Sequence, residues 1–229
     1  AQGVNNHNVA NASTTGFRAD LAAFQSRAVD GTGWASRVYA TNTTTGWNHH
    51  SGALLSAGRV LDIAINGEGW LAVQSPDGTA AYARAGDLGV GADGLLRTNT
   101  GQLVLGDSGP ISVPPYTSLF VARDGSVSIV PQGQDATTTA TVGRIKLVNP
   151  PREDLDRGAD GLFRLRDGTA APADAAVQVA QATLESSNVN AAESIVNMLE
   201  LARRFEMQVK AIKTAEQNAD SATRLMRMG

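Results

Sequence analysis

The sequence contains no cysteine, which excludes disulfides, thiolate metal sites and thiol nucleophiles together. Such a chain suits either a reducing cytosol or a protein that stays unfolded and unlinked during transport. The sequence also lacks an apolar run of the roughly eighteen residues that a membrane-spanning helix needs, and its first residues have neither the basic nor the apolar region of a signal peptide. We therefore expect no direct insertion into a membrane.

Positive charge is also limited. The 19 Lys and Arg residues are outnumbered by 22 Asp and Glu residues, the net charge is −3, and there is no basic run. We therefore expect no binding to nucleic acid or to an anionic membrane surface. The 229 residues, of which 42% are hydrophobic and 18% charged, are ordinary for a folded protein of one or two domains.

Residues 190–228 carry the clearest periodic pattern in the chain. Apolar side chains recur there at alternating steps of three and four, the spacing of a coiled-coil seam, at Ile195, Met198, Ala202, Phe205, Val209 and Ile212. Neither proline nor glycine interrupts the pattern, and Asn190 followed by Glu193 indicates a helix cap. A single helix of this length is about 55–60 Å long. Because one small domain cannot cover it, we predict that partner helices bury the seam, contributing on the order of 10–20 kcal/mol as an upper bound.

The first part of the chain shows weaker signals. Residues 1–10 favour a short helix that ends at Asn11, and Leu21, Ala22 and Phe24 favour a brief second helix. Glycine, threonine, serine and asparagine dominate residues 31–57. We interpret this segment as a long extended connection held by a few aromatic side chains.

From Val60 onward apolar residues recur at every second position, which is the spacing of a β-strand. Leu61, Ile63 and Ile65 alternate with other residues, and Asn–Gly and Asp–Gly turns then separate many short apolar segments as far as Leu184. We therefore expect an α+β protein in which a β-rich globular domain, an irregular sandwich or barrel, is flanked by N- and C-terminal helices that pair as a coiled-coil-like domain. The expected regions are residues 1–30 for the N-terminal helical segment, 31–59 for the linker, 60–184 for the β-rich domain and 185–229 for the C-terminal helix.

Few residues are placed to carry chemistry. Residues 67–72 match G-x-G-x-x-A, but they lie between predicted strands and open no helix that could hold a phosphate. The histidines, His7, His49 and His50, have no carboxylate at ligand spacing, and no G-x-S-x-G or Cys–His pattern occurs. We therefore expect no enzymatic activity, no catalytic residue, no metal site and no cofactor. A hydrolase that depends on Glu68 is the weakest alternative.

Residues 8–18, 61–86 and 184–210 together resemble one family, the axial proteins that build the rod and hook of the bacterial flagellum. The three segments occur in the family's order and cover both ends and the middle of the chain. The positions that match the family's motifs are Asn8, Asn11, Thr15, Gly16, Phe17, Asn66, Gly67, Gly69, Asn188 and Asn190.

Within this family the chain is most similar to the proximal rod proteins, and the distal rod proteins are the alternative. The resemblance implies export of the unfolded chain through the flagellar type III apparatus, a route that a cysteine-free sequence suits. It also implies assembly in the periplasm into a helical tube lined by the terminal helices, with other rod subunits and further copies of the same chain as partners. Family members begin some twenty or more residues earlier, so we expect a further helical segment before residue 1.

The favoured hypothesis is a structural subunit of the basal-body rod that transmits torque in motility. The residues expected to pack between subunits are Val4, Val9, Phe17, Ile195, Met198, Ala202, Phe205, Val209 and Ile212. The alternative from another class is an extracellular binding or adhesin module, trimerised by the helix, that uses Trp34, Trp47 and Trp70 as a glycan platform.

Overall fold

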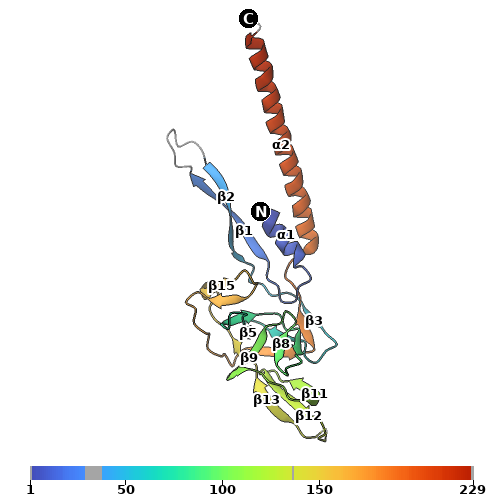
Figure 1. The fold of residues 1–229 in the computed structure, drawn as a ribbon. Coiled ribbons are helices and arrows are strands. Elements are labelled where there is room, and N and C mark those ends of the chain that lie inside the picture. Colours follow the sequence, from blue (N-terminus) through green and yellow to red (C-terminus); the bar gives the residue numbers. More distant parts are fainter. Residues whose placement is uncertain (1, 29–37, 136, 228–229) are drawn as a thin grey trace. The chain divides into compact units, whose positions relative to one another are not determined.

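The computed structural model describes residues 2–28, 38–135 and 137–227, and the chain divides into two compact units (Figure 1). Unit 1 consists of Ala1–Ala12, Ala19–Asn48 and Val189–Gly229, and unit 2 consists of Ser13–Arg18 and His49–Asn188.

Unit 1 contains the predicted long helix, α2, over Ala191–Arg227. Asn190 caps this helix, because its Oδ1 accepts a hydrogen bond of 3.2 Å from the N–H of Glu193. The 37 residues of α2 correspond to about 56 Å at 1.5 Å per residue. A short helix, α1 (Gln2–Ala10), packs against α2, and Asn5 Nδ2 donates to the backbone oxygen of Ser194 at 2.7 Å. The prediction of an uninterrupted C-terminal helix is confirmed.

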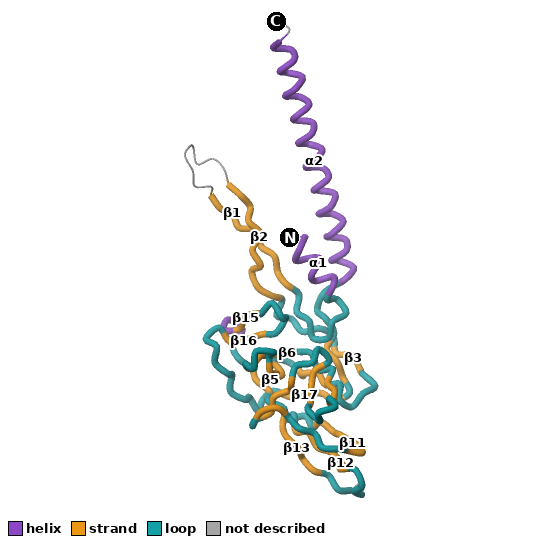
Figure 2. The backbone as a smooth tube through the Cα atoms, in the orientation of Figure 1, coloured by secondary structure: helices purple, strands orange, loops and turns teal. Residues whose placement is uncertain are grey.

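The rest of unit 1 differs from the prediction. Where we expected a brief helix followed by an extended connection, β1 (Asp20–Ala28) and β2 (Val38–Trp47) form an antiparallel hairpin (Figure 2). The register runs from Asp20↔Trp47 to Ala28↔Val38. Strand pairing satisfies backbone groups that a lone connection would leave to water, and the β-branched residues of β2 suit a strand. The start of the expected connection, residues 31–37 with Trp34, lies outside the described residues.

Unit 2 is built from short strands, as the turn signals predicted. They are β3 (Leu54–Ser56), β4 (Ile63–Asn66), β5 (Trp70–Gln74), β6 (Ala80–Ala83), β7 (Leu88–Val90), β8 (Leu96–Thr98), β9 (Leu103–Gly106), β10 (Gly109–Pro110), β11 (Tyr116–Val121), β12 (Ser126–Pro131), β13 (Ala140–Arg144), β14 (Leu147–Val148), β15 (Leu155–Arg157), β16 (Phe163–Leu165), β17 (Gln178–Gln181) and β18 (Thr183–Glu185), with one 3₁₀ turn at Arg152–Asp154.

The strands of unit 2 pair in antiparallel fashion. The largest sheet has nine strands in the order β15-β16-β6-β5-β9-β8-β7, with β10 added to β9 and β14 added to β5. A three-stranded sheet has the order β11-β12-β13, and two smaller pairs join β17 to β4 and β18 to β3. The last two pairs bring the end of unit 2 back to its beginning.

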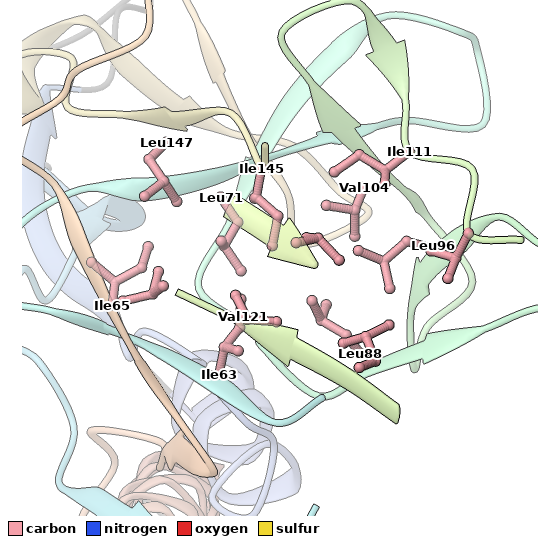
Figure 3. Packing of buried hydrophobic residues seen from close by; sticks show 14 of the residues in the cluster. Ile63, Ile65, Leu71, Leu88, Leu96, Val104, Ile111, Val121, Ile145 and Leu147 are labelled. Atoms are coloured by element: carbon pink, nitrogen blue, oxygen red, sulfur yellow. The ribbon is translucent and has the colours of Figure 1, made fainter. Parts of the chain in front are cut away.

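One hydrophobic cluster joins these sheets (Figure 3). It combines side chains of the nine-stranded sheet, of the three-stranded sheet and of the β4–β17 pair, including Leu71, Leu88, Leu96, Val104, Leu147, Val121, Val127, Ile63, Ile65 and Val179. In β4 three successive residues, Ile63, Ala64 and Ile65, are buried, so both faces of this strand are covered. A β-rich unit with a sandwich-like core is therefore confirmed.

Candidate functional site

Two parts of the molecule have the properties of a functional site, and the first is a junction inside unit 2. Here the segment 13–18 meets the segment 185–188. The N–H of Gly16 donates to the backbone oxygen of Glu185 at 2.8 Å, and the N–H of Asn188 donates to that of Phe17 at 3.2 Å. Gly16 has a φ of +66°, and a Cβ at this position would overlap the backbone of Arg84. The junction therefore requires glycine at position 16.

A buried charge cluster lies in this junction. The carboxylate of Glu185 is 2.5 Å from Arg18 Nη1 and 2.9 Å from Arg84 Nε, and none of the three side chains is more than 2% exposed. These two contacts have ion-pair distances without hydrogen-bond geometry. The N–H of Gly52 also donates to Glu185 Oε1, at 2.9 Å. The single carboxylate is therefore shared between two guanidinium groups and a backbone donor.

Arg84 makes the widest set of contacts in the cluster. Its Nη1 donates to the backbone oxygen of Gly69 and its Nη2 to that of Gly67, both at 2.8 Å, and Nη2 also donates to Ser51 Oγ at 3.0 Å. Burial lowers the pKa of the Arg84 guanidinium, and the neighbouring Glu185 carboxylate opposes this shift. The glycines that sequence reasoning compared with a nucleotide-binding loop thus present backbone oxygens to an arginine of the same chain.

Phe17 and Asn188, two of the motif residues, also support this junction. The guanidinium of Arg157 lies 4.5 Å from the centre of the Phe17 ring, and its Nη1 donates to the backbone oxygen of Arg18 at 2.9 Å. Asn188 Nδ2 donates to the backbone oxygen of His50 at 2.7 Å. Phe17 is only 7% exposed, so the structure places it in the interior of unit 2 and we leave it out of the proposed surface between subunits.

Arg18, Arg84 and Glu185 all lie in segments that resemble the family, but their contact was not predicted from the sequence. The available signal was a charged residue next to buried apolar strands, as in Tyr82-Ala83-Arg84. Such residues need a partner of opposite charge when they are buried.

The second part is the helical surface of unit 1. Asn8 holds α1 to the start of β1, because its Nδ2 donates to the backbone oxygen of Asp20 at 2.9 Å and its Oδ1 accepts from the Asp20 N–H at 2.8 Å. His7 Nδ1 lies 2.6 Å from the Asp20 carboxylate, and Asn11 Nδ2 donates to the backbone oxygen of His7 at 2.9 Å. The family-motif asparagines of α1 and its C-terminal turn therefore fix local geometry.

The predicted seam residues of α2 fall into two groups. Met198, Ala202 and Val209 are half-buried, as are Val4 and Val9 from the N-terminal helix. Ile195, Phe205 and Ile212 are exposed by 44%, 65% and 60%. Three more apolar side chains of α2, Val196, Leu199 and Met207, are also exposed. Every residue from 210 to 223 is exposed, so α1 covers only the first half of the helix.

A groove of about 330 Å³ opens on this helical surface of unit 1. Its lining comes from α1, from the start of β1 and from α2, and includes Val4, Asp20, Leu21, Glu200, Leu201 and Arg204.

The remaining motif residues, and the residues considered above for catalysis or glycan binding, lie in ordinary structural contacts. Thr15 is half-buried, and Asn66 pairs with Gln178 between β4 and β17. Glu68 is exposed and forms an ion pair with Arg152. Trp47 and Trp70 are buried at 7% and 6% exposure, so they form no exposed platform.

The described residues contain neither a cluster of metal-ligating side chains nor a membrane-spanning helix. Among residues 2–28, 38–135 and 137–227, no group of three or more His, Cys, Asp or Glu side chains is arranged to hold a metal ion. In the same part of the chain, no helix combines the length and apolar character needed to cross a membrane.

Comparison with known proteins adds independent information. Residues 180–225 match the family model described as flagellar basal body rod FlgEFG protein C-terminal, and residues 64–129 match the one described as flagellar hook protein FlgE/F/G D1 domain. The chain is 41% identical to the flagellar basal-body rod protein FlgF of Escherichia coli K12 and 40% identical to that of Salmonella typhimurium LT2, in each case over 99% of this chain and 92% of the relative. It is 30% identical to the flagellar basal-body rod protein FlgG of Buchnera aphidicola from Acyrthosiphon pisum, over 96% of this chain and 91% of the relative. The chain therefore belongs to the flagellar basal-body rod protein family.

Proposed function

We propose that this protein is a structural subunit of the proximal part of the flagellar rod, located in the periplasm as part of the basal body. The identity of about 40% to two FlgF proteins supports a proximal position, whereas the identity to the FlgG protein is 30%. A distal position is the second candidate. The names of the relatives support a role in assembly without catalysis.

The observation that carries this proposal is the apolar surface of α2. Phe205, Ile212 and Leu199 are each more than half exposed on a helix that α1 covers over only its first half. Burying one such side chain contributes about 1.5–3 kcal/mol. This free energy is gained when a further helix covers these side chains, whether that helix precedes residue 1 or belongs to a neighbouring subunit.

In the proposed assembly, α1 and α2 pair in a coiled-coil-like manner and neighbouring subunits cover the rest of the seam. The residues that we propose to pack between subunits are Val4, Val9, Ile195, Met198, Ala202, Phe205, Val209 and Ile212. Partners are other rod subunits and further copies of this chain. The cysteine-free sequence agrees with export of an unfolded chain through the flagellar type III apparatus.

The test is complementation of a strain that lacks its own FlgF-type rod protein, measured as swimming in soft agar. The chain should restore motility and Phe205→Asp should abolish it, because a carboxylate cannot be buried in an apolar contact. Phe120, which is 48% exposed on β11 of unit 2, provides the matched control, and Phe120→Asp should retain motility. A motile Phe205→Asp strain would argue strongly against assembly through this seam.

A further inference from the structure

We propose that Asp62 and Asp87 of unit 2 form a proton-binding pair, in which a protonated Asp87 donates a hydrogen bond to the carboxylate of Asp62. Asp62 immediately precedes β4, which pairs with β17, and Asp87 immediately precedes β7, the last strand of the nine-stranded sheet. The proton therefore joins two sheets of unit 2. This inference concerns the single chain and goes beyond the proposed role as a rod subunit.

The backbone places the two aspartates directly opposite each other. Asp62 and Asp87 form an isolated antiparallel bridge. Backbone hydrogen bonds flank this bridge on both sides, from Ile63 to Gly86 at 2.8 Å and from Leu88 to Leu61 at 3.3 Å. The aspartates are therefore a non-hydrogen-bonded pair, in which opposed side chains share one face and approach most closely, with Cβ atoms about 4.5–5.5 Å apart.

The carboxylate of Asp62 has an oxygen without a hydrogen bond. Asp62 is 4% exposed, and its Oδ1 is buried with no hydrogen-bond donor. Arg59 Nη1 lies 3.7 Å from this oxygen, which is too far for a hydrogen bond, and the Arg59 side chain is 63% exposed. A buried oxygen without a donor destabilises the folded state. The pair therefore lacks one donor.

A protonated Asp87 supplies that donor. Two carboxylates that lie directly opposite each other repel when both are ionised. Burial raises the pKa of the Asp87 carboxyl group and the charge of Asp62 adds to this increase, whereas a hydrogen bond from Asn99 and the charge of Arg59 oppose it. The charged groups that contribute most to this pKa are thus Asp62 and Arg59. A proton on Asp87 removes the repulsion and satisfies the buried oxygen.

The pH decides which residue is the partner of Asp62. At neutral pH this partner is Arg59, whose Nη2 also donates to the backbone oxygen of Leu88 at 2.8 Å. As the pH falls, Asp87 takes up a proton and binds Asp62 directly. Because the pKa of Asp87 is raised in the folded state, this contribution to stability is complete below the ordinary value of 3.8 and is lost as the pH rises through the raised pKa. Mild acid therefore strengthens the contact between the two sheets.

A carboxyl NMR titration of the purified chain measures this proton uptake directly. We expect Asp87 to titrate above its ordinary value of 3.8. Asp62→Asn, which removes the opposing charge, should lower the Asp87 midpoint by about one pH unit. Arg59→Gln, which removes the nearby cation, should raise this midpoint. Asp107, an exposed aspartate between β9 and β10, is the reference, and its titration should be the same in all three proteins.

Urea unfolding gives a second measurement. Asp87→Asn mimics the protonated side chain, because its amide is uncharged and can donate to Asp62. At about pH 7.5 this substitution should raise the ratio of folded to unfolded protein about fivefold, the effect of relieving one unfavourable cross-strand pair. The gain should be much smaller at about pH 4, where Asp87 of the unaltered chain carries the proton itself. Asp107→Asn is the matched control and should change the ratio at neither pH.

Four results would overturn the inference. The first is titration of Asp87 at or below 3.8 in the folded, unaltered chain, a measurement that requires no variant to fold. The second is an Asp87 midpoint that Asp62→Asn leaves unchanged. The third is an Asp87→Asn variant no more stable than the unaltered chain at about pH 7.5. The fourth is stabilisation at this pH by magnesium or calcium ions that Asp62→Asn abolishes, because a metal cation would then take the place assigned to the proton.

Discussion

Replacing Glu185 by glutamine would test whether the buried charge cluster holds unit 2 together. The substitution keeps the size of the side chain and removes the negative charge that Arg18 and Arg84 share at 2.5 and 2.9 Å. The two guanidinium groups, each 2% exposed, would then remain buried without an anion. Removing one partner of a buried ion pair costs about 3–5 kcal/mol. Since a folded domain is stable by about 5–15 kcal/mol, this loss is a large part of the total.

The measurement is urea unfolding followed by tryptophan fluorescence. Trp70 is a suitable reporter because it is 6% exposed and its ring centre lies 5.9 Å from the guanidinium carbon of Arg84. Glu68→Gln is the matched control, since it breaks the ion pair with Arg152, in which the side chains are 67% and 54% exposed. An exposed pair of this kind contributes about 0–1 kcal/mol.

A second substitution sharpens the test. Arg18→Met in the Glu185→Gln background removes one of the two unpaired charges, so it should be less destabilising than Arg18→Met in the unaltered chain. Free energies of unfolding that simply add, or a loss for Glu185→Gln no larger than that for Glu68→Gln, would refute the idea that the cluster stabilises the junction.

Three further predictions concern local features. Gly16→Ala should destabilise unit 2 by about 1–3 kcal/mol in urea unfolding, because Gly16 has a positive φ and an added Cβ would overlap the backbone of Arg84. The control is Gly3→Ala in helix α1, where an added Cβ meets no atom within 4 Å, and this substitution should be neutral or stabilising. Equal effects of the two substitutions would contradict this account. Asn190→Ala should destabilise helix α2 by about 1 kcal/mol, because it removes the cap. Hydrogen exchange should then show increased fraying at the start of α2. Unchanged protection of the first turn would show that the cap is dispensable. Hydrogen bonds from the side chain and backbone of Ser126 lower the pKa of the Asp124 carboxyl group below its ordinary value of 3.8. The ionised carboxylate therefore stabilises the folded state at pH values above 3.8, and this contribution is lost as the pH falls below that value. Asp124→Asn, which can keep the turn, should therefore reduce the pH dependence of unfolding below about pH 4, and an unchanged dependence would exclude this carboxylate as a contributor.

The features that were predictable from the sequence are those set by neighbouring residues. The spacing of apolar residues and the cap at Asn190 are sufficient to predict α2, because a helix is made of contacts three and four residues apart. The Asp–Gly turns likewise mark the strands of unit 2, as at Asp124, where the N–H of Ser126 donates to the aspartate side chain. Both signals are local.

The features that were not predictable depend on distant partners. The hairpin of β1 and β2 was missed because Leu-Ala-Ala-Phe suits a helix as well as a strand, and only the pairing with residues 38–47 decides between them. The cluster of Arg18, Arg84 and Glu185 was missed because its members come from three segments that only the complete fold brings together. The exposed seam of α2 was predicted only in part. The spacing of its apolar residues indicated that a partner covers the helix, but it did not show where on the molecule that partner would bind, and it did not predict the groove beside the seam.

The hydrogen bond from Asn188 Nδ2 to the backbone oxygen of His50 has a consequence for how this protein varies. It places the two ends of the segment 49–188 next to each other in space, so this β-rich segment is an insertion with closely spaced ends. Insertions of this kind can be exchanged, enlarged or removed with little effect on the segments that precede and follow them. A β-rich segment of another size, grafted between residues 48 and 189, should therefore leave the terminal helices intact, so that one pair of helices can carry different β-rich units.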